Sequence, residues 1–138
     1  MNNTDSNIKM PFKATHSLSD EYKLQMGRTI ASQIIASASN GGVIMSWGVI
    51  DGFHASEMDF DPALYFGVNG RLFHGWVVVR YNTGGDDYEI WLANNGEAKK
   101  VAENVYCNEL ADTIDRHIEQ GEDPEEYQRW LVNNALTA

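Results

Sequence analysis

The chain has 138 residues, a net charge of −10 and a single cysteine, Cys107. This length favours one domain, and a lone cysteine excludes an intrachain disulfide and is typical of a reducing compartment. No apolar run approaches the ~18 residues that a membrane span needs, and the polar residues 1–6 do not resemble a secretion signal. The sequence therefore predicts a soluble, cytoplasmic protein with no membrane partner, in which residues 1–16 form a flexible N-terminal arm and residues 17–138 a single domain.

The negative charge is concentrated towards the C-terminal end. Residues 103–138 hold nine acidic and only two basic side chains. Nucleic-acid affinity comes largely from Lys and Arg that replace cations at phosphates, so direct nucleic-acid binding is disfavoured. A solvated helix surface explains these acids. The alternative is an acidic inhibitor that mimics DNA and occupies a DNA-binding protein.

Apolar residues recur at helical spacing in the first third of the chain. The pattern predicts a helix over residues 19–39, capped by Ser17 or Ser19 and burying Ile30 and Ile34. The Asn40-Gly41-Gly42 segment ends this helix, because glycine adopts the left-handed C-terminal conformation without steric cost.

The middle of the chain is rich in β-branched and aromatic residues. The pattern predicts an antiparallel meander with strands over residues 43–49, 63–68, 71–81, 88–94 and 97–102. An acidic connection over residues 51–62 joins the first two strands. The later connections are Asn69-Gly70, expected as a two-residue type I′ turn, a longer loop over residues 82–87, and Asn95-Gly96, also expected as a two-residue turn.

Two helices are expected to close the chain. The first starts near Asn104, carries Cys107 as a small core residue and ends at Gly121. The second starts at Asp123-Pro124, since Asp is a preferred cap and Pro a preferred first helical residue. The order of elements predicts an α+β fold: an N-terminal helix, a five-stranded antiparallel meander and two C-terminal helices.

The expected turns place specific residues opposite one another in the sheet. The predicted pairs are Phe66–Phe73, Tyr65–His74, Tyr81–Tyr88, Val79–Ile90, Arg80–Glu89, Val78–Trp91, Ile90–Val101 and Trp91–Lys100. One face then forms the core under the helices. It carries Leu64, Phe66, Val68, Phe73, Val77, Val79, Tyr88, Ile90, Leu92 and Val101.

The opposite face is the predicted binding surface. It carries Tyr65, His74, Trp76, Val78, Arg80, Glu89, Trp91 and Lys100. Two tryptophans and a tyrosine exceed what a solvated face needs, and Trp, Tyr and Arg are the usual anchors of interfaces. We expect the charged residues at the margin and Lys100 against the Trp91 ring. The alternative is that a helix or the N-terminal arm covers this face.

The search for catalytic and ligand motifs selects no residue. The chain lacks a phosphate loop, a dinucleotide fingerprint and zinc-ligand spacing, so we expect no cofactor and no metal. An enzyme remains an alternative only through the acidic segment 51–61, where carboxylates could be brought together for acid–base chemistry.

Three short stretches carry a family resemblance. They are residues 41–48 (Gly-Gly-Val-Ile-Met-Ser-Trp-Gly), the hairpin 63–89 with Arg80-Tyr81-Asn82 followed by Asp87-Tyr88-Glu89, and Val105-Tyr106-Cys107-Asn108-Glu109-Leu110. In this order they are similar to segments of a family of small uncharacterised proteins encoded on phages and conjugative elements. This chain departs from the family at Val49-Ile50, where an Ala-Lys pair is usual, and in its helix from Pro124. The family has no established activity, so the resemblance implies a mobile-element context and no catalytic residue.

Taken together, these features predict a module that works by binding. Its partner would be an unknown protein or a second copy of the chain. The aromatic sheet face is the expected contact surface.

Overall fold

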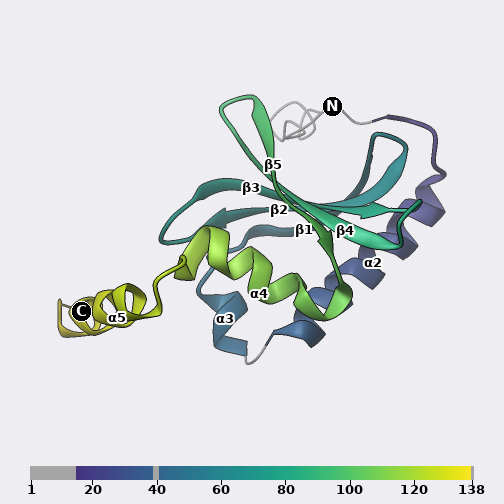
Figure 1. Ribbon diagram of the computed structural model, residues 1–138. Helices are drawn as coiled ribbons and strands as arrows, with labels where there is room; N and C mark the ends of the chain where they lie inside the picture. The colour runs from purple at the N-terminus through teal and green to yellow at the C-terminus, as the bar shows by residue number, and fades with distance from the viewer. Residues whose placement is uncertain (1–14, 39–40, 138) are drawn as a thin grey trace.

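The computed structural model describes residues 15–38 and 41–137, so the first fourteen residues of the predicted arm lie outside the described part. Figure 1 shows the arrangement of the elements. The helical elements are α2 (Asp20–Ser37), α3 (Gly41–Met45), the 3₁₀ turn η1 (Cys107–Glu109), α4 (Leu110–Asp115), the π-helical segment η2 (Arg116–Gln120) and α5 (Pro124–Thr137). The strands are β1 (Ile50–Met58), β2 (Asp61–Asn69), β3 (His74–Asn82), β4 (Asp87–Asn94) and β5 (Glu97–Val105).

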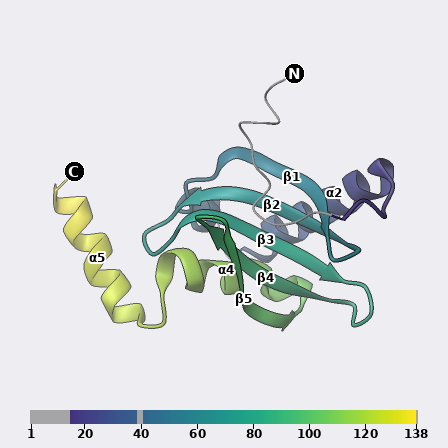
Figure 2. The same ribbon diagram turned by 90° about the horizontal axis from the view of Figure 1, so that it is seen from above.

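The five strands form one antiparallel sheet in the order β1-β2-β3-β4-β5. Helices α2 and α4 lie on the same side of this sheet (Figure 1). Seen from above, the strands lie in front of α4 (Figure 2). The α+β fold predicted from the sequence is therefore confirmed.

Helix α2 begins and packs as its sequence predicts. The Ser19 side chain caps it by accepting a hydrogen bond of 3.2 Å from the backbone N–H of Tyr22. Ile30 and Ile34 are fully buried against the sheet. Gly27 lets the helix approach β1 closely, because a Cβ at this position would lie only 2.7 Å from Cβ of Ala55.

The strand predicted over residues 43–49 is wrong. These residues form the end of the short helix α3 and a turn that buries Trp47 completely. The indole Nε1 of Trp47 donates a hydrogen bond of 2.8 Å to Oδ1 of Asp115, the last residue of α4. Burial of this large side chain outweighs the local preference of Val43 and Ile44 for a strand.

The acidic connection predicted over residues 51–62 is also wrong, because most of it is strand β1. A register shift between Ile50 and His54 interrupts the pairing with β2, and Asp51 and Gly52 have positive φ angles of 62° and 73°. This bulge hides the alternating pattern from which a strand is recognised.

The Asn69-Gly70 turn is longer than predicted. Asn69 pairs with His74 and Phe66 with Val77, so the predicted pairs Phe66–Phe73 and Tyr65–His74 are wrong, and Gly70 does not have the positive φ of a type I′ turn. Segment 70–73 is instead bound to η2, since the backbone N–H of Leu72 donates to the carbonyl oxygen of Ile118 at 2.8 Å.

The other two hairpins follow the prediction closely. Between β3 and β4, the pairs Tyr81–Tyr88, Val79–Ile90, Arg80–Glu89 and Val78–Trp91 are all confirmed. Asn95 and Gly96 form the predicted two-residue turn with φ of 53° and 83°. The Trp91–Lys100 pair is confirmed as well, but an irregularity shifts Ile90 from Val101 to Ala102.

The first C-terminal helix starts later than predicted. Strand β5 continues through Asn104 to Val105, and η1 places Cys107 at the surface instead of in the core. Gly121 ends η2 with a φ of 81°, as its position predicts. Asp123 caps α5 by accepting from the backbone N–H of Glu125 at 3.0 Å.

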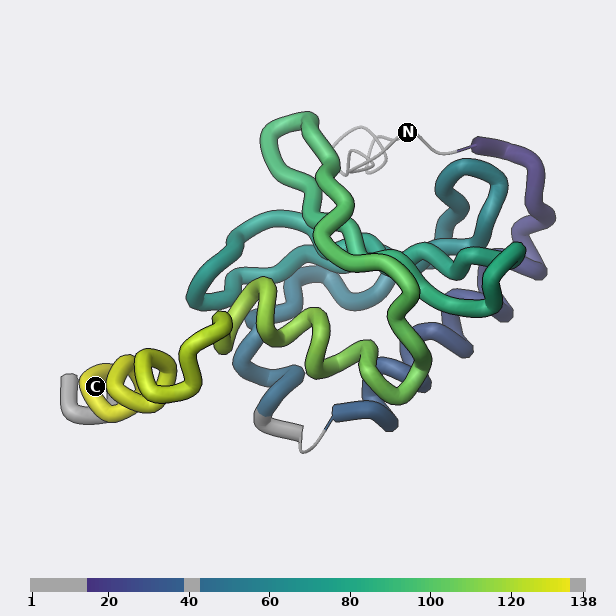
Figure 3. Tube along the Cα trace, viewed as in Figure 1, coloured from purple at the N-terminus to yellow at the C-terminus, as the bar shows by residue number. Residues whose placement is uncertain are grey.

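Arg71 attaches α5 to the rest of the protein. Its Nε and Nη2 donate to the carbonyl oxygens of Glu119 and Gln120 at 2.9 and 2.8 Å. Its guanidinium carbon lies 5.3 Å from the ring centre of Tyr127 and 5.6 Å from that of Trp130. Helix α5 itself projects from one end of the molecule (Figure 3).

The main core lies between the sheet and the helices. Every residue predicted for the core face either belongs to this core or packs against it. From the helical side, the core receives Ile30, Ile34, Leu110, Ala111, Ile114 and Ile118. The sequence alternation thus identifies the buried face correctly.

A buried carboxylate holds the segment before α2 against the end of β1. Glu57 is fully buried and accepts hydrogen bonds from the Thr15 hydroxyl, the Ser17 hydroxyl (2.8 Å), the Ser17 N–H (3.0 Å) and the Leu18 N–H (2.9 Å). Burial by itself raises the pKa of a carboxyl, but these donors outweigh it and lower the pKa of Glu57 from 4.5 to about 2.

Replacing Ile34 by alanine should lower the free energy of unfolding by about 2–4 kcal/mol, because it leaves a cavity in the packed core. Its neighbour Ile35 is 57% exposed and supplies a matched control. Ile35→Ala should cost less than about 0.5 kcal/mol. Urea denaturation measures both, and equal losses would contradict the assigned helix face.

Replacing Gly70 by alanine should destabilise the protein by roughly 1–3 kcal/mol through a steric clash. The added Cβ would lie 2.4 Å from the carbonyl oxygen of Ile118, which cannot move without disturbing η2. At Gly84 the nearest atom is 3.8 Å away, so Gly84→Ala serves as the control. Thermal and urea melts that show the same stability for both variants would contradict the close contact.

The stabilisation from Glu57 should depend on pH in a defined direction. The folded state lowers the pKa of this carboxyl, so the stabilisation is complete above the ordinary value of 4.5 and is lost as the pH falls towards about 2. The difference in free energy of unfolding between wild type and Glu57→Gln should therefore shrink over this range. Denaturation curves at a series of pH values measure it, and a constant difference would contradict the prediction.

Candidate functional site

The predicted binding residues lie on the side of the sheet that no described helix covers. We call this surface the helix-free face. It consists of Tyr65, His74, Trp76, Val78, Arg80, Glu89, Trp91 and Lys100, together with His54, Met58 and Ala63, which the sequence analysis did not assign to it. The face comes together because residues two apart in a strand point to the same side.

An aromatic cluster crosses this face from β1 to β4. The rings of Tyr65, His54 and Trp76 all contact one another: Tyr65 is stacked on His54 at 5.0 Å and edge-on to Trp76 at 5.6 Å, and His54 lies 6.4 Å from Trp76. Val78 pairs with Tyr65 on one side and with Trp91 on the other. Tyr65 and Val78 are buried, whereas both indoles are partly exposed and pack against them. The tryptophans thus form the outer layer of a small second core.

Small neighbours leave space around Trp76. Its register partners are Gly67 on β2 and Ala93 on β4. A Cβ at Gly67 would come within 3.6 Å of the indole ring. Beside the indole lies a shallow cavity of about 360 Å³, whose lining includes Trp76, His74, Ile50 and Asp51. The exposed His74 thus lies at the edge of the cluster, as part of this cavity.

A network of ion pairs occupies the other end of the helix-free face. Arg80 contacts Oε1 of Glu89 through Nη1 at 3.0 Å and Oδ2 of Asp61 through Nη2 at 2.8 Å. Its Nε also donates to the carbonyl oxygen of Met58 at 3.1 Å. The indole Nε1 of Trp91 donates to the same Glu89 oxygen at 3.0 Å. Glu89 therefore fixes Arg80 and Trp91 relative to each other.

The expected contact between Lys100 and the Trp91 ring does not occur among the described residues. The Lys100 ammonium group lies 2.9 Å from Oε1 of Glu103 and 4.0 Å from Oε2 of Glu89. The hydrogen bond to Glu103 raises the pKa of Lys100. Nearby carboxylates hold this cation more strongly than the face of an indole does.

His54 is the residue of this cluster that the sequence analysis missed. Its Nε2 is buried and has no hydrogen-bond partner among the described residues. An unpartnered buried ring nitrogen is unusual in a folded protein. The missed signal was strand β1 itself, because its bulge and its acidic residues made the segment resemble a connection.

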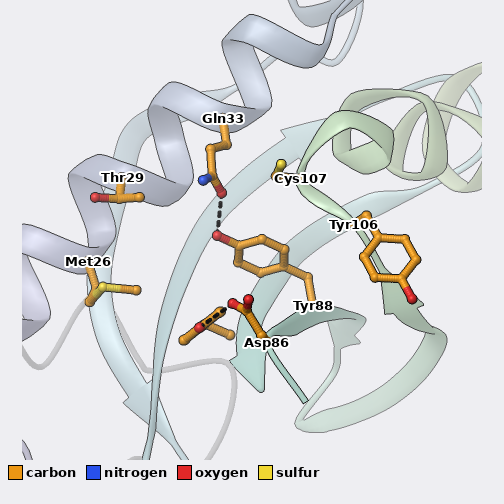
Figure 4. Close-up of a pocket in the computed structure, with 8 residues that line it drawn as sticks. Met26, Thr29, Gln33, Asp86, Tyr88, Tyr106 and Cys107 are labelled. Carbon is orange, nitrogen blue, oxygen red and sulfur yellow. Dashed lines mark hydrogen bonds between the residues drawn. The ribbon is translucent and has the colours of Figure 1, made fainter. Parts of the chain in front are cut away.

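A second hollow lies on the opposite side of the sheet, beside α2. Figure 4 shows Gln33, Tyr88 and Asp86 following one another across it, with Met26 and Thr29 on one side and Tyr106 on the other. Its volume is about 410 Å³. The Tyr88 hydroxyl donates to Oε1 of Gln33, and the Tyr81 hydroxyl donates to Oδ1 of Asp86 at 2.5 Å. We call this hollow the tyrosine cavity.

Two carboxylates of the acidic segment 51–61 are bound by other parts of the chain. Glu57 binds the residues before α2, whereas Asp61 binds Arg80 and accepts from the Thr83 hydroxyl at 2.6 Å. In the described part of the chain, no cluster of three or more His, Cys, Asp or Glu side chains is arranged to hold a metal ion. No described helix is both long and apolar enough to span a bilayer.

Comparison with known proteins adds no relative to this description. Neither a family model, nor a curated protein sequence, nor a solved structure matches the chain. The case for function therefore depends on the geometry of the two surfaces described above.

Proposed function

We propose that this protein is a self-associating module whose helix-free face binds the same face of a second copy. The observation that carries the proposal is the pair of partly exposed indoles, Trp76 and Trp91, which lie over a small core that no described helix covers. Contiguous aromatic surface of this kind is typical of interfaces, and tryptophans are the residues that most often dominate their energy.

The distribution of charge favours a second copy as the partner. The chain carries −10, so two copies repel each other over most of their surfaces. On and beside the helix-free face, the carboxylates of Asp61, Glu89 and Glu103 are paired with Arg80 and Lys100. Ion pairing on this face therefore reduces the repulsion between two helix-free faces that approach each other.

The register also suits a two-fold contact. A two-fold contact uses the same surface patch on both copies. The patch must therefore be complementary to itself and must contain both positive and negative side chains as well as the apolar anchor residues. The helix-free face carries indoles at its centre and Arg80, Glu89 and Lys100 at one end. An antiparallel arrangement of two faces then brings indoles against indoles and leaves the charged groups at the rim.

Trp76→Ala should shift the protein from dimer to monomer in sedimentation velocity at high micromolar concentration. Trp130→Ala is the matched control, because Trp130 is also partly exposed but lies on α5 beside Arg71. That variant should remain dimeric. Circular dichroism of both variants checks that the fold persists.

A second variant keeps the test decisive if Trp76→Ala unfolds. Lys100→Glu changes an exposed side chain at the rim and replaces attraction by repulsion, so it should weaken the dimer without loss of fold. A wild-type chain that stays monomeric, or variants that dimerise as well as wild type, would overturn the proposal.

The mobile-element context implied by the family resemblance stays a prediction, as does the alternative of an acidic DNA mimic. Neither has a specific contact or surface in its favour here.

A further inference from the structure

We propose that the tyrosine cavity binds a small organic ammonium ion. This inference is independent of self-association, because the cavity lies on the helical side of the sheet, between α2, the β3–β4 hairpin and the β5–η1 connection. Its lining includes Gln33 from α2, Tyr81, Asp86 and Tyr88 from the hairpin, and Tyr106 and Cys107 from the connection.

The charge of the cavity selects a cation. Asp86 supplies a carboxylate, and no Lys or Arg is among the described lining residues. The Tyr81 hydroxyl donates to this carboxylate and holds its position, and the bond raises the pKa of Tyr81 to about 12. The phenol therefore acts as a hydrogen-bond donor towards the Asp86 carboxylate.

The aromatic rings select an organic cation over a metal ion. Tyr81 and Tyr88 lie 5.5 Å apart between ring centres, with their planes inclined at 56°, and Tyr106 adds a third ring. Ring faces attract ammonium groups with bound carbon substituents, which is how aromatic cages recognise methylated amines. A hard metal ion requires several oxygen ligands, whereas Asp86 is the single carboxylate among the described lining residues.

The two phenol oxygens of the cavity can also accept hydrogen bonds. The Tyr88 hydroxyl donates a hydrogen bond to Oε1 of Gln33, and burial raises the pKa of Tyr88 to about 12. The Tyr81 hydroxyl likewise donates its hydrogen bond to Oδ1 of Asp86. Each phenol oxygen keeps lone pairs that can accept a hydrogen bond from an ammonium N–H or lie against a polarised methyl group.

The cavity is accessible and has a suitable size. Tyr106 is 58% exposed and Cys107 is exposed, so both lie at the opening. The volume of about 410 Å³ is in the range of small-ligand sites. Figure 4 shows Gln33 and Cys107 towards one end of the cavity and Asp86 towards the other.

The position of Cys107 provides a direct assay, since it is the only cysteine in the chain. Its alkylation by N-ethylmaleimide is followed with choline as the probe ligand, and with 3,3-dimethylbutan-1-ol as its uncharged isostere. Choline should slow the alkylation in a saturable manner, and the alcohol should not. Equal protection by both compounds, or protection by neither, would overturn the proposal.

Two variants test the assigned residues. Asp86→Asn removes the charge and keeps the positive φ of 54°, which Asn tolerates, so the fold should persist and the affinity for choline should fall about tenfold. The matched control, Glu122→Gln, removes an exposed carboxylate before α5 and should leave the affinity unchanged.

Tyr106→Leu removes an exposed ring and should weaken choline binding several-fold, with no change in the melting temperature. Isothermal titration with choline measures the affinity of each variant without reliance on Cys107. If Asp86→Asn and Glu122→Gln bind choline as the wild type does, the cavity does not recognise the cation and the proposal is wrong.

Discussion

Burial of one face of the sheet beneath α2 and α4 is the interaction on which the rest of the structure depends. Ile30 and Ile34 from α2 meet Ile114 and Ile118 from the C-terminal half over the same strands, so segments far apart in sequence share one core. The sheet has two faces and these helices cover only one of them. The aromatic residues of the other face must therefore be shielded from water without a helix. They pack on each other, with the two tryptophans outermost. The tyrosine cavity lies on the covered side of the sheet, between α2, the β3–β4 hairpin and the β5–η1 connection.

Polar contacts then fix what apolar burial leaves undetermined. Burial sets which sides of the elements face each other, but it is weakly directional. Glu57 holds the residues before α2 at the end of β1 through four hydrogen bonds, and Arg71 joins the β2–β3 turn, η2 and α5 through carbonyl oxygens and two aromatic rings. Both are charged groups with little exposure, and such groups are stable only when their partners are in place. Glu57 and Arg71 therefore stabilise the fold only when the segment before α2 and helix α5 are correctly placed.

The helix-free face could be predicted although one of its hairpins was assigned incorrectly. Phe66 lies opposite Val77 rather than Phe73, a displacement of an even number of residues. An even displacement keeps each side chain on its own face, whereas a shift of one residue would have exchanged the faces. Strand β1 and His54 were missed for a different reason, because the bulge at Asp51 and Gly52 breaks the alternation. The tyrosine cavity was not predicted, since Gln33, Asp86 and Cys107 are brought together by packing and share no local pattern.

The sequence by itself determined the elements whose signals are local: the periodic helix with its Ser19 cap, the Asn95-Gly96 turn, the Asp123 cap and the side of each central strand that is buried. Only the tertiary structure decided that residues 41–45 form a helix, that segment 70–73 widens into a turn bound to η2, and that Cys107 is exposed. The physical reason is the range of the forces. Side-chain periodicity and capping act within one turn or strand, whereas burial of Trp47 against Asp115 and the bond from Leu72 to Ile118 join residues that are distant in sequence. Such contacts outweigh local propensity and leave no mark in the sequence near the residues that they move.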